Sequence, residues 1–223
     1  MRRFKFSDLL IGILFTLLFI SLSVVITINF RPLYYMDVNV LNIEQTSGYG
    51  KQEILDNYNA LIDYSSPFYR GELTFPTFAA SEAGLIHFDE VKNIFTFFYF
   101  LGAVTLIAGV CIIIQKHKKK DISYLFVSSI TSIVLPLIFG LLLFLDFDKA
   151  FLVFHKLFFK NDYWIFDPST DPVINILPDT FFLHCALLII FFILLGSIAF
   201  IVVYLTKRRH YSIRYRQTKS LKF

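Results

Sequence analysis

Four long apolar runs constrain the fold of this chain more than any other feature. They are residues 9–30, 94–114, 122–145 and 181–205, and none carries a charged side chain. A helix of roughly 20 apolar residues crosses about 30 Å of hydrocarbon, so each run is long enough to span a membrane. Lipid cannot hydrogen-bond open backbone groups, and spans of this kind must therefore be helical. The sequence predicts an all-α membrane protein with four transmembrane helices.

The composition agrees with a membrane protein of one domain. The chain has 223 residues, of which 56% are hydrophobic and 18% aromatic, and its mean hydropathy is +0.63. These values lie outside the range of soluble domains.

The first run has no small-x-small cleavage pattern before Arg31, so we interpret it as a retained helix. The two cysteines, Cys111 and Cys185, both fall inside runs and form no disulfide framework or thiolate metal site. We expect a single integral membrane domain over residues 1–223.

The distribution of charge predicts the orientation. Lysine and arginine gather before the first run (Arg2, Arg3, Lys5), in the turn between the second and third (Lys116, Lys118, Lys119, Lys120), and in the basic tail, residues 206–223. Residues 31–93 hold nine acidic and four basic side chains, and residues 146–180 hold six aspartates and three lysines. Basic segments stay in the cytoplasm. We therefore expect both termini to be cytoplasmic and both long loops to face outward. The net charge of +4 then needs no nucleic-acid partner.

Each long loop contains a segment with helical periodicity. In residues 51–64 the apolar side chains recur every three or four positions, which predicts a short amphipathic helix. In the second loop one helical side carries Phe151, Phe154, His155, Phe158 and Phe159, and the other carries Lys156 and Lys160. His155 is therefore expected to point toward lipid or toward the helix bundle. We expect both short helices to lie at the membrane interface.

Two of the five histidines stand out as candidates for chemistry. His87 and His155 both belong to the loops expected outside, both adjoin a run, and both are followed by acidic residues. Such a pair can act as general base and acid near neutral pH, or can be structural. A zinc site is less favoured because the chain has no H-E-x-x-H motif, and we predict no metal. A serine hydrolase is disfavoured by the lack of a G-x-S-x-G motif.

The other histidines have simpler interpretations. His117 lies in the lysine-rich turn and His210 in the basic tail, so we interpret both as parts of solvated faces. His184 precedes Cys185 directly, and adjacent helix positions do not face each other, which argues against a cysteine–histidine dyad. We interpret His184 as a hydrogen-bonding histidine at the membrane interface.

Two longer motifs, built around the candidate histidines, resemble a known family. The first is His87-Phe88-x-Glu90-Val91-Lys92, and the second runs from Phe154-His155 through Asn161-Asp162-x-Trp164-x-Phe166-Asp167-Pro168 to Asp171. Together with the order of the four runs and the stretch from Asn57 to Tyr64, they are similar to bacterial lipoprotein intramolecular transacylases, the Lit family. The resemblance covers nearly the whole chain.

The resemblance implies an activity. Proteins of that family move the sn-2 acyl chain of a diacylglyceryl lipoprotein from glycerol to the α-amino group of the lipoprotein's N-terminal cysteine. The product is an N-acyl S-monoacylglyceryl (lyso-form) lipoprotein. The family's essential histidines match His87 and His155. The implied partners are lipoproteins and membrane lipid, without a soluble cofactor, at the outer face of a bacterial cell membrane.

The roles of individual residues follow as hypotheses. We expect His87 to be the general base, and His155 to polarise the ester carbonyl or protonate the leaving alkoxide. An acyl-imidazole intermediate on one histidine is the alternative route. Candidates for binding or orienting the substrate are Tyr58, Glu90, Asn161, Asp162, Trp164, Asp167 and Asp171. The aspartates among them can attract the substrate's ammonium group, and can equally be turn-forming residues. A non-catalytic membrane module that binds a ligand through the same loops is the alternative function.

Overall fold

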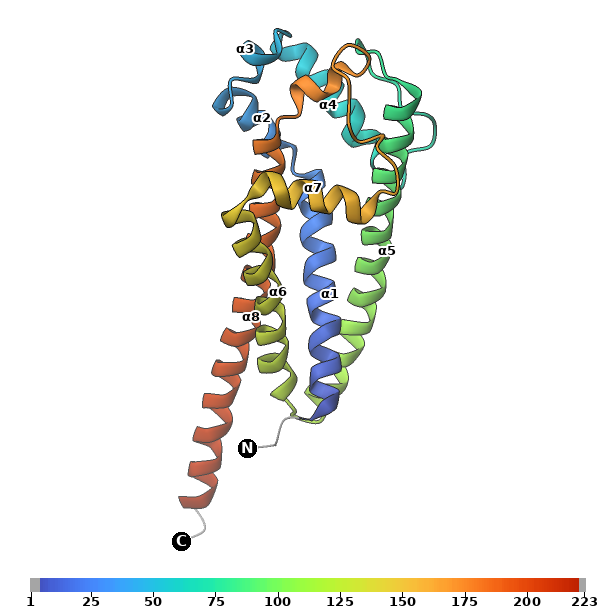
Figure 1. Ribbon diagram of the computed structural model, residues 1–223. Helices are drawn as coiled ribbons and strands as arrows, with labels where there is room; N and C mark the ends of the chain where they lie inside the picture. Colours follow the sequence, from blue (N-terminus) through green and yellow to red (C-terminus); the bar gives the residue numbers. More distant parts are fainter. Residues whose placement is uncertain (1–4, 221–223) are drawn as a thin grey trace. The chain divides into compact units, whose positions relative to one another are not determined.

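Helices make up all the regular structure of the described part of the chain. The computed structural model describes residues 5–220, except the side chains of residues 135, 211, 212 and 214–220. Its helices are α1 (Phe6–Asn29), α2 (Arg31–Val40), α3 (Ile43–Ser47), α4 (Lys51–Tyr64), α5 (Glu82–Lys118), α6 (Ser123–Leu145), α7 (Phe147–Phe158), the 3₁₀ helix η1 (Pro172–Ile176) and α8 (Asp179–Ser220) (Figure 1). No strand occurs within residues 5–220. The prediction of an all-α protein is confirmed.

Four of these helices are long and apolar enough to cross a membrane. They are α1, α5, α6 and α8, which contain the four predicted runs. Helix α5 begins 12 residues before the predicted run because no proline interrupts the chain between Glu82 and Ile94. Helix α8 continues to Ser220, so the predicted basic tail is helical through that residue. Arg2, Arg3 and the last three residues of the tail lie outside the described residues.

The chain forms two compact units, and the boundaries between them fall within the four long helices. Unit 1 consists of residues 1–23, 101–139 and 190–223. Its core contains Phe15, Leu18, Tyr124, Leu125 and Tyr204. Small residues bring its helices together: the Cα of Gly12 lies against Thr131, where an added Cβ would come within 2.8 Å of the hydroxyl oxygen.

A buried charge network is the main polar feature of unit 1. Lys116 Nζ donates to Asp8 Oδ1 at 2.9 Å and to Asp121 Oδ2 at 3.0 Å, and Ser123 Oγ lies within hydrogen-bond distance of both aspartates. Asp8 is fully buried and Asp121 nearly so. The network thus joins the start of α1, the end of α5 and the start of α6. These bonds lower the pKa of Asp121 to about 2, against the effect of burial, so its carboxylate is charged.

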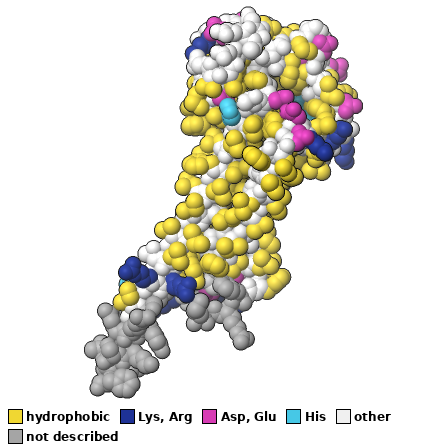
Figure 2. Space-filling model, turned by 60° about the vertical axis from the view of Figure 1, so that its left-hand side comes forward, with side chains coloured by type: hydrophobic (Ala, Val, Ile, Leu, Met, Phe, Trp, Pro, Cys, Tyr) yellow, Lys and Arg dark blue, Asp and Glu magenta, His cyan; other side chains and the backbone are white. Residues whose placement is uncertain are grey.

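Unit 2 holds both candidate histidines and comprises residues 24–100 and 140–189. Its core combines side chains of α2, α3, α4, the segment between α4 and α5, η1 and the first turn of α8. At its centre Tyr34 stacks on Tyr58 with 3.6 Å between ring centroids, and Tyr34 donates its hydroxyl to the carbonyl of Ile176 at 2.7 Å. All acidic residues except Asp8 and Asp121 belong to this unit, and Figure 2 shows acidic side chains gathered on part of its surface.

The irregular segment between α4 and α5 is held in place by Asn57. The Asn57 side chain is fully buried and donates to the carbonyl of Glu53 and to Thr77 Oγ1, both at 2.8 Å. Its oxygen accepts the backbone N–H groups of Thr77 and Phe78 at 3.3 Å. One amide therefore replaces the regular backbone bonds that this segment lacks, and the segment leads directly into the helix that carries His87.

Candidate active site

The start of helix α5 is fixed by two hydrogen bonds before the helix reaches His87. Ser81 Oγ accepts the backbone N–H of Gly84 at 3.0 Å, which is the bond of a helix N-cap. The N–H of Ser81 itself donates to Asp171 Oδ1 at 2.8 Å. Asp171, which was expected to contact the substrate or orient an imidazole, is 2% exposed and engaged in this cap.

His87 is enclosed by aromatic rings. Its side chain is 5% exposed, with the ring of Phe159 at 4.6 Å and that of Phe166 at 5.5 Å between centroids. Its Nδ1 atom is buried and has no hydrogen-bond partner among the described residues. A buried polar atom without a partner is uncommon because it costs free energy, and it marks a position where a ligand can bind.

His155 lies on α7, which begins at an N-cap aspartate, Asp146, that accepts the N–H of Lys149. The His155 side chain is 8% exposed, and its Nδ1 lies 2.8 Å from the carbonyl oxygen of Phe151. A carbonyl only accepts, so Nδ1 carries the proton and Nε2 offers a lone pair in the neutral ring. Burial lowers the pKa of His155, while the bond to Phe151 opposes that change. We expected His155 to point either toward lipid or toward the helix bundle, and its burial shows that it points into the protein.

The two imidazoles lie near each other. Their ring centroids are 6.2 Å apart with 32° between the ring planes. Phe159 contacts both rings, at 4.6 Å from His87 and 5.6 Å from His155. Trp164 covers His155 at 4.7 Å. The pair therefore sits within an aromatic enclosure, a setting from which water is largely excluded.

Glu90 and Asn161 join the two histidine-bearing segments. Asn161 Nδ2 donates to Glu90 Oε1 at 2.8 Å, and the other oxygen, Glu90 Oε2, is buried without a partner in the described chain. The carbonyl of Asn161 accepts the indole N–H of Trp164 at 3.1 Å. Three of the candidate residues expected from the sequence are thus linked to one another and, through Trp164, to His155.

The remaining candidates lie elsewhere or have other partners. Tyr58 is 3% exposed in the aromatic core with Tyr34 and Phe181. Asp162 is exposed. Asp167 accepts the N–H and hydroxyl of Ser169, and these bonds lower the pKa of its carboxyl group. The contacts of Asp167 are therefore those of a turn-forming residue.

A contact between His184 and Asp37 was not anticipated from the sequence. His184 Nδ1 lies 2.9 Å from both carboxylate oxygens of Asp37, which is fully buried on α2. We expected His184 to form a hydrogen bond, but 147 residues separate it from this partner. Phe159 and Phe166, which wall His87, were likewise part of the motif without being recognised as site residues.

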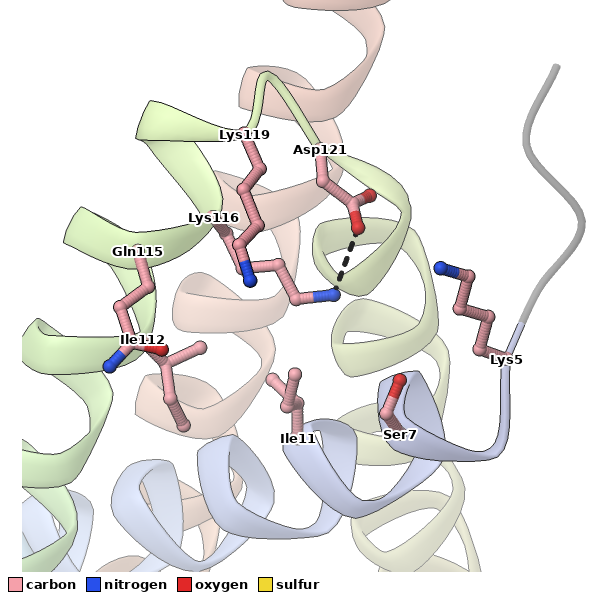
Figure 3. A pocket seen from close by; sticks show the side chains of 8 residues that line it. All are labelled: Lys5, Ser7, Ile11, Ile112, Gln115, Lys116, Lys119 and Asp121. Carbon is pink, nitrogen blue, oxygen red and sulfur yellow. Dashed lines mark hydrogen bonds and ion pairs between the residues drawn. The ribbon is translucent and has the colours of Figure 1, made fainter.

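The described residues outside this cluster offer no comparable site. No group of three or more His, Cys, Asp or Glu side chains there has a geometry suited to a metal ion. Unit 1 contains a pocket of about 250 Å³ lined by Lys5, Ser7, Ile11, Ile112, Gln115, Lys116, Lys119 and Asp121, and it holds no histidine (Figure 3). In that pocket Lys116 is paired with Asp121.

Two neighbouring imidazoles in an apolar, aromatic enclosure can transfer protons to and from a lipid-borne group. The fold defines an α-helical membrane protein, and the family match makes it an enzyme of the acyltransferase class. Residues 9–182 match the family described as lipoprotein intramolecular transacylase Lit. The chain belongs to this family, as its two motifs indicated.

Solved structures agree with this assignment. The chain is similar to the membrane integral lipoprotein intramolecular transacylase Lit from Bacillus cereus, with 37% identity, a TM-score of 0.89, and coverage of 93% of this chain and 98% of that one. Two variants of the same B. cereus protein, in which a histidine is replaced by arginine or by alanine, give TM-scores of 0.82 and 0.84, again at 37% identity. They cover 93% and 92% of this chain, and 95% and 94% of theirs. A comparison with curated proteins gives no significant match.

Proposed function

We propose that this protein moves the sn-2 acyl chain of a diacylglyceryl lipoprotein from glycerol to the α-amino group of that lipoprotein's N-terminal cysteine. The product is an N-acyl S-monoacylglyceryl lipoprotein. The observation that carries the proposal is the pair of buried imidazoles, 6.2 Å apart, in an enclosure of aromatic side chains. Family membership supports the reaction class.

The proposed chemistry depends mainly on placement. Ester and amine belong to one substrate molecule, so holding them together can supply a large part of the rate. The rings of Phe159, Phe166 and Trp164 provide a shaped apolar surface around the histidines for this purpose. A strong protein nucleophile is then unnecessary.

Proton transfer is assigned to the histidines. His87 takes a proton from the amine nitrogen as the N–C bond forms and passes it to Nε2 of His155, which is neutral at the start. The resulting imidazolium of His155 gives this proton to the glycerol alkoxide as the C–O bond breaks, and both rings are then neutral again. The lowered pKa of His155 makes its imidazolium a stronger acid. A route through an acyl-imidazole would leave a labelled acyl group on His87 after rapid denaturation, whereas the direct route leaves none.

We further propose that both termini are cytoplasmic and that unit 2 faces outward in the cell membrane. The lysine-rich turn and tail against the acidic loops support this orientation. The reaction uses no soluble cofactor in this proposal, and its partners are lipoproteins and membrane lipid. The alternative, a non-catalytic module that binds a ligand through the same loops, is disfavoured because the chain belongs to an enzyme family.

Mass spectrometry of lipoprotein N-terminal peptides tests the function. The protein is expressed in a bacterial host whose lipoproteins carry only the diacylglyceryl group. We expect N-acyl S-monoacylglyceryl peptides to appear with the intact chain and to be missing with a His87→Ala variant. Unchanged acylation with the intact, membrane-inserted chain would exclude the transacylase proposal and favour the binding module.

A further inference from the structure

Helix α5 carries two buried polar atoms without a hydrogen-bond partner in the described residues. They are Nδ1 of His87 and Oε2 of Glu90. Residues three apart in a helix are neighbours on one face, so the two atoms lie on the same side of α5. Native proteins rarely leave such atoms unpaired. Two of them on one face indicate a subsite whose hydrogen-bond donors come from a ligand.

The chemistry of these atoms restricts the ligand. A carboxylate oxygen only accepts hydrogen bonds, and Nδ1 of His87 accepts when the ring carries its proton on Nε2. The ligand must therefore offer at least two donors, and a positive charge matches the carboxylate. A hydroxyl group has one donor and cannot serve both atoms. A primary ammonium has three N–H groups and a charge, and it meets both requirements.

The surrounding residues hold Glu90 for such a ligand. Asn161 binds the other oxygen, Oε1, and is itself tied to Trp164. No described lysine or arginine forms an ion pair with Glu90. Lys92, two positions along the chain, is engaged elsewhere, because its Nζ donates to the carbonyl of Tyr69 at 3.2 Å and lies 4.2 Å from the centre of the Tyr64 ring.

We propose that Glu90 binds the α-ammonium group of the lipoprotein's N-terminal cysteine, placed between Glu90 Oε2 and His87 Nδ1. This subsite rests on the proposed transacylation. Of the three ammonium protons, one is released to solvent when the amine forms and one passes to His87 as the N–C bond forms. The third remains on the amide nitrogen. Glu90 thereby takes the role that the sequence suggested for the aspartates of the second loop, since Asp167 and Asp171 are hydrogen-bonded as a turn and a helix cap.

Binding of two unreactive substrate analogues tests the subsite. Both are diacylglyceryl-cysteine peptides with ether-linked chains, one with a free α-amino group and the other N-acetylated. We expect the intact protein in detergent micelles to bind the free-amine peptide about tenfold or more tightly than the acetylated one. Glu90→Gln, an isosteric change, should bind the two peptides equally. Asp89→Asn removes a neighbouring carboxylate that bonds Tyr64 and Asn93 instead, and it should keep the preference.

The outcomes separate the subsite from the reaction. If the intact protein shows no preference, or if Glu90→Gln keeps it, the subsite is wrong, whatever ester-linked substrate is converted. If the preference is present and lost with Glu90→Gln, while ester-linked substrate yields no product with the intact protein, the subsite stands and the proposed function fails. If Glu90→Gln does not fold, the pH dependence of binding to the intact protein tests the subsite. The preference for the free-amine peptide must disappear as the pH rises above the pKa of the peptide's α-amino group, and a preference that persists would contradict the subsite.

Discussion

Asp171 accepts the backbone N–H of Ser81 through Oδ1 at 2.8 Å, across 90 residues of chain. This bond ties the segment after α7 to Ser81, the residue just before α5, which lies three positions before Gly84 and six before His87. Asp171 also approaches Gly84 so closely that an added Cβ would overlap its Oδ1. The contact between Asp171 and the helix start therefore requires glycine at position 84, and it positions His87 relative to Phe166.

Asp171→Ala should destabilise the protein by about 1 kcal/mol or more, which is typical for the loss of a helix-capping bond. Gly84→Ala should have a similar or larger effect, because the new methyl group also meets the ring of Phe166 at 3.1 Å. Thermal unfolding of the purified proteins in detergent measures both. Asp167→Ala, which removes only the two exposed turn bonds to Ser169, is the matched control and should unfold close to the unchanged protein. Equal effects of the two aspartate substitutions would contradict the capping role.

His87→Ala and His155→Ala should each reduce transfer by about 10²–10⁴-fold, the range of a lost general acid or base. The reason is that each removes one of the two groups that move a proton, while the long apolar helices remain. Mass spectrometry of substrate lipopeptides measures transfer, and membrane fractionation measures insertion. His117→Ala, at an exposed position near the C-terminal end of α5, is the control and should keep full activity. Loss of both variants from the membrane would instead indicate a structural role.

The sequence was sufficient to locate the four candidate spanning helices and to single out two histidines that the structure brings together, whereas the roles of these histidines remain predictions. Spans are defined by hydropathy, a property of consecutive residues, and the runs were found within a few residues of helices α1 and α6. The helical phase of residues 147–158 likewise narrowed the direction of His155, because a short amphipathic helix buries one side. The family resemblance then gave the pair its significance.

Contacts between distant segments were beyond the reach of sequence reasoning. Asp37 appeared as one of many loop acids, yet it is fully buried against His184. Glu90 and Asn161 were named as candidates, but only the structure shows the bond between them and the unpaired oxygen on Glu90. Tyr58 was named as a candidate for binding the substrate, yet its side chain belongs to the buried core around Tyr34. Periodicity identifies a buried face and not its partner.

Acid should destabilise the folded protein in part through His155. Burial lowers the pKa of this group in the folded state below its ordinary value of 6.5, so the unfolded chain binds the proton more tightly. The contribution of His155 to the free energy of unfolding is therefore constant above pH 6.5 and decreases as the pH falls from 6.5 toward the folded pKa. Denaturant unfolding at pH 7.5 and pH 5.5 measures it. His155→Phe should lose less stability than the unchanged protein over this interval; an equal loss would contradict the buried neutral state.

Transfer should be insensitive to chelators. The prediction follows from a mechanism in which imidazoles alone move protons, and the described His, Cys, Asp and Glu side chains form no group of three suited to a metal ion. Activity of the purified protein is compared before and after dialysis against excess EDTA. A loss that zinc restores would show that a metal takes part and would overturn the proton-transfer roles given to His87 and His155.

His184→Ala should be among the most destabilising substitutions in unit 2. It leaves the carboxylate of Asp37, which is fully buried, without the imidazole that binds both of its oxygens. Leaving a buried acceptor without its hydrogen-bond donor costs about 1–3 kcal/mol, and more when the acceptor is charged. Thermal and denaturant unfolding in detergent measure the loss.

A double variant separates the unpaired charge from simple loss of packing. Asp37→Asn with His184→Gln replaces the pair by two neutral amides that can hydrogen-bond each other, and it should recover most of the stability lost in His184→Ala. Because His184 bonds Asp37 and not His87 or His155, the folded double variant should transfer acyl chains at close to the normal rate. A folded double variant without transfer would mean that His184 takes part in the reaction itself, as a third histidine of the site.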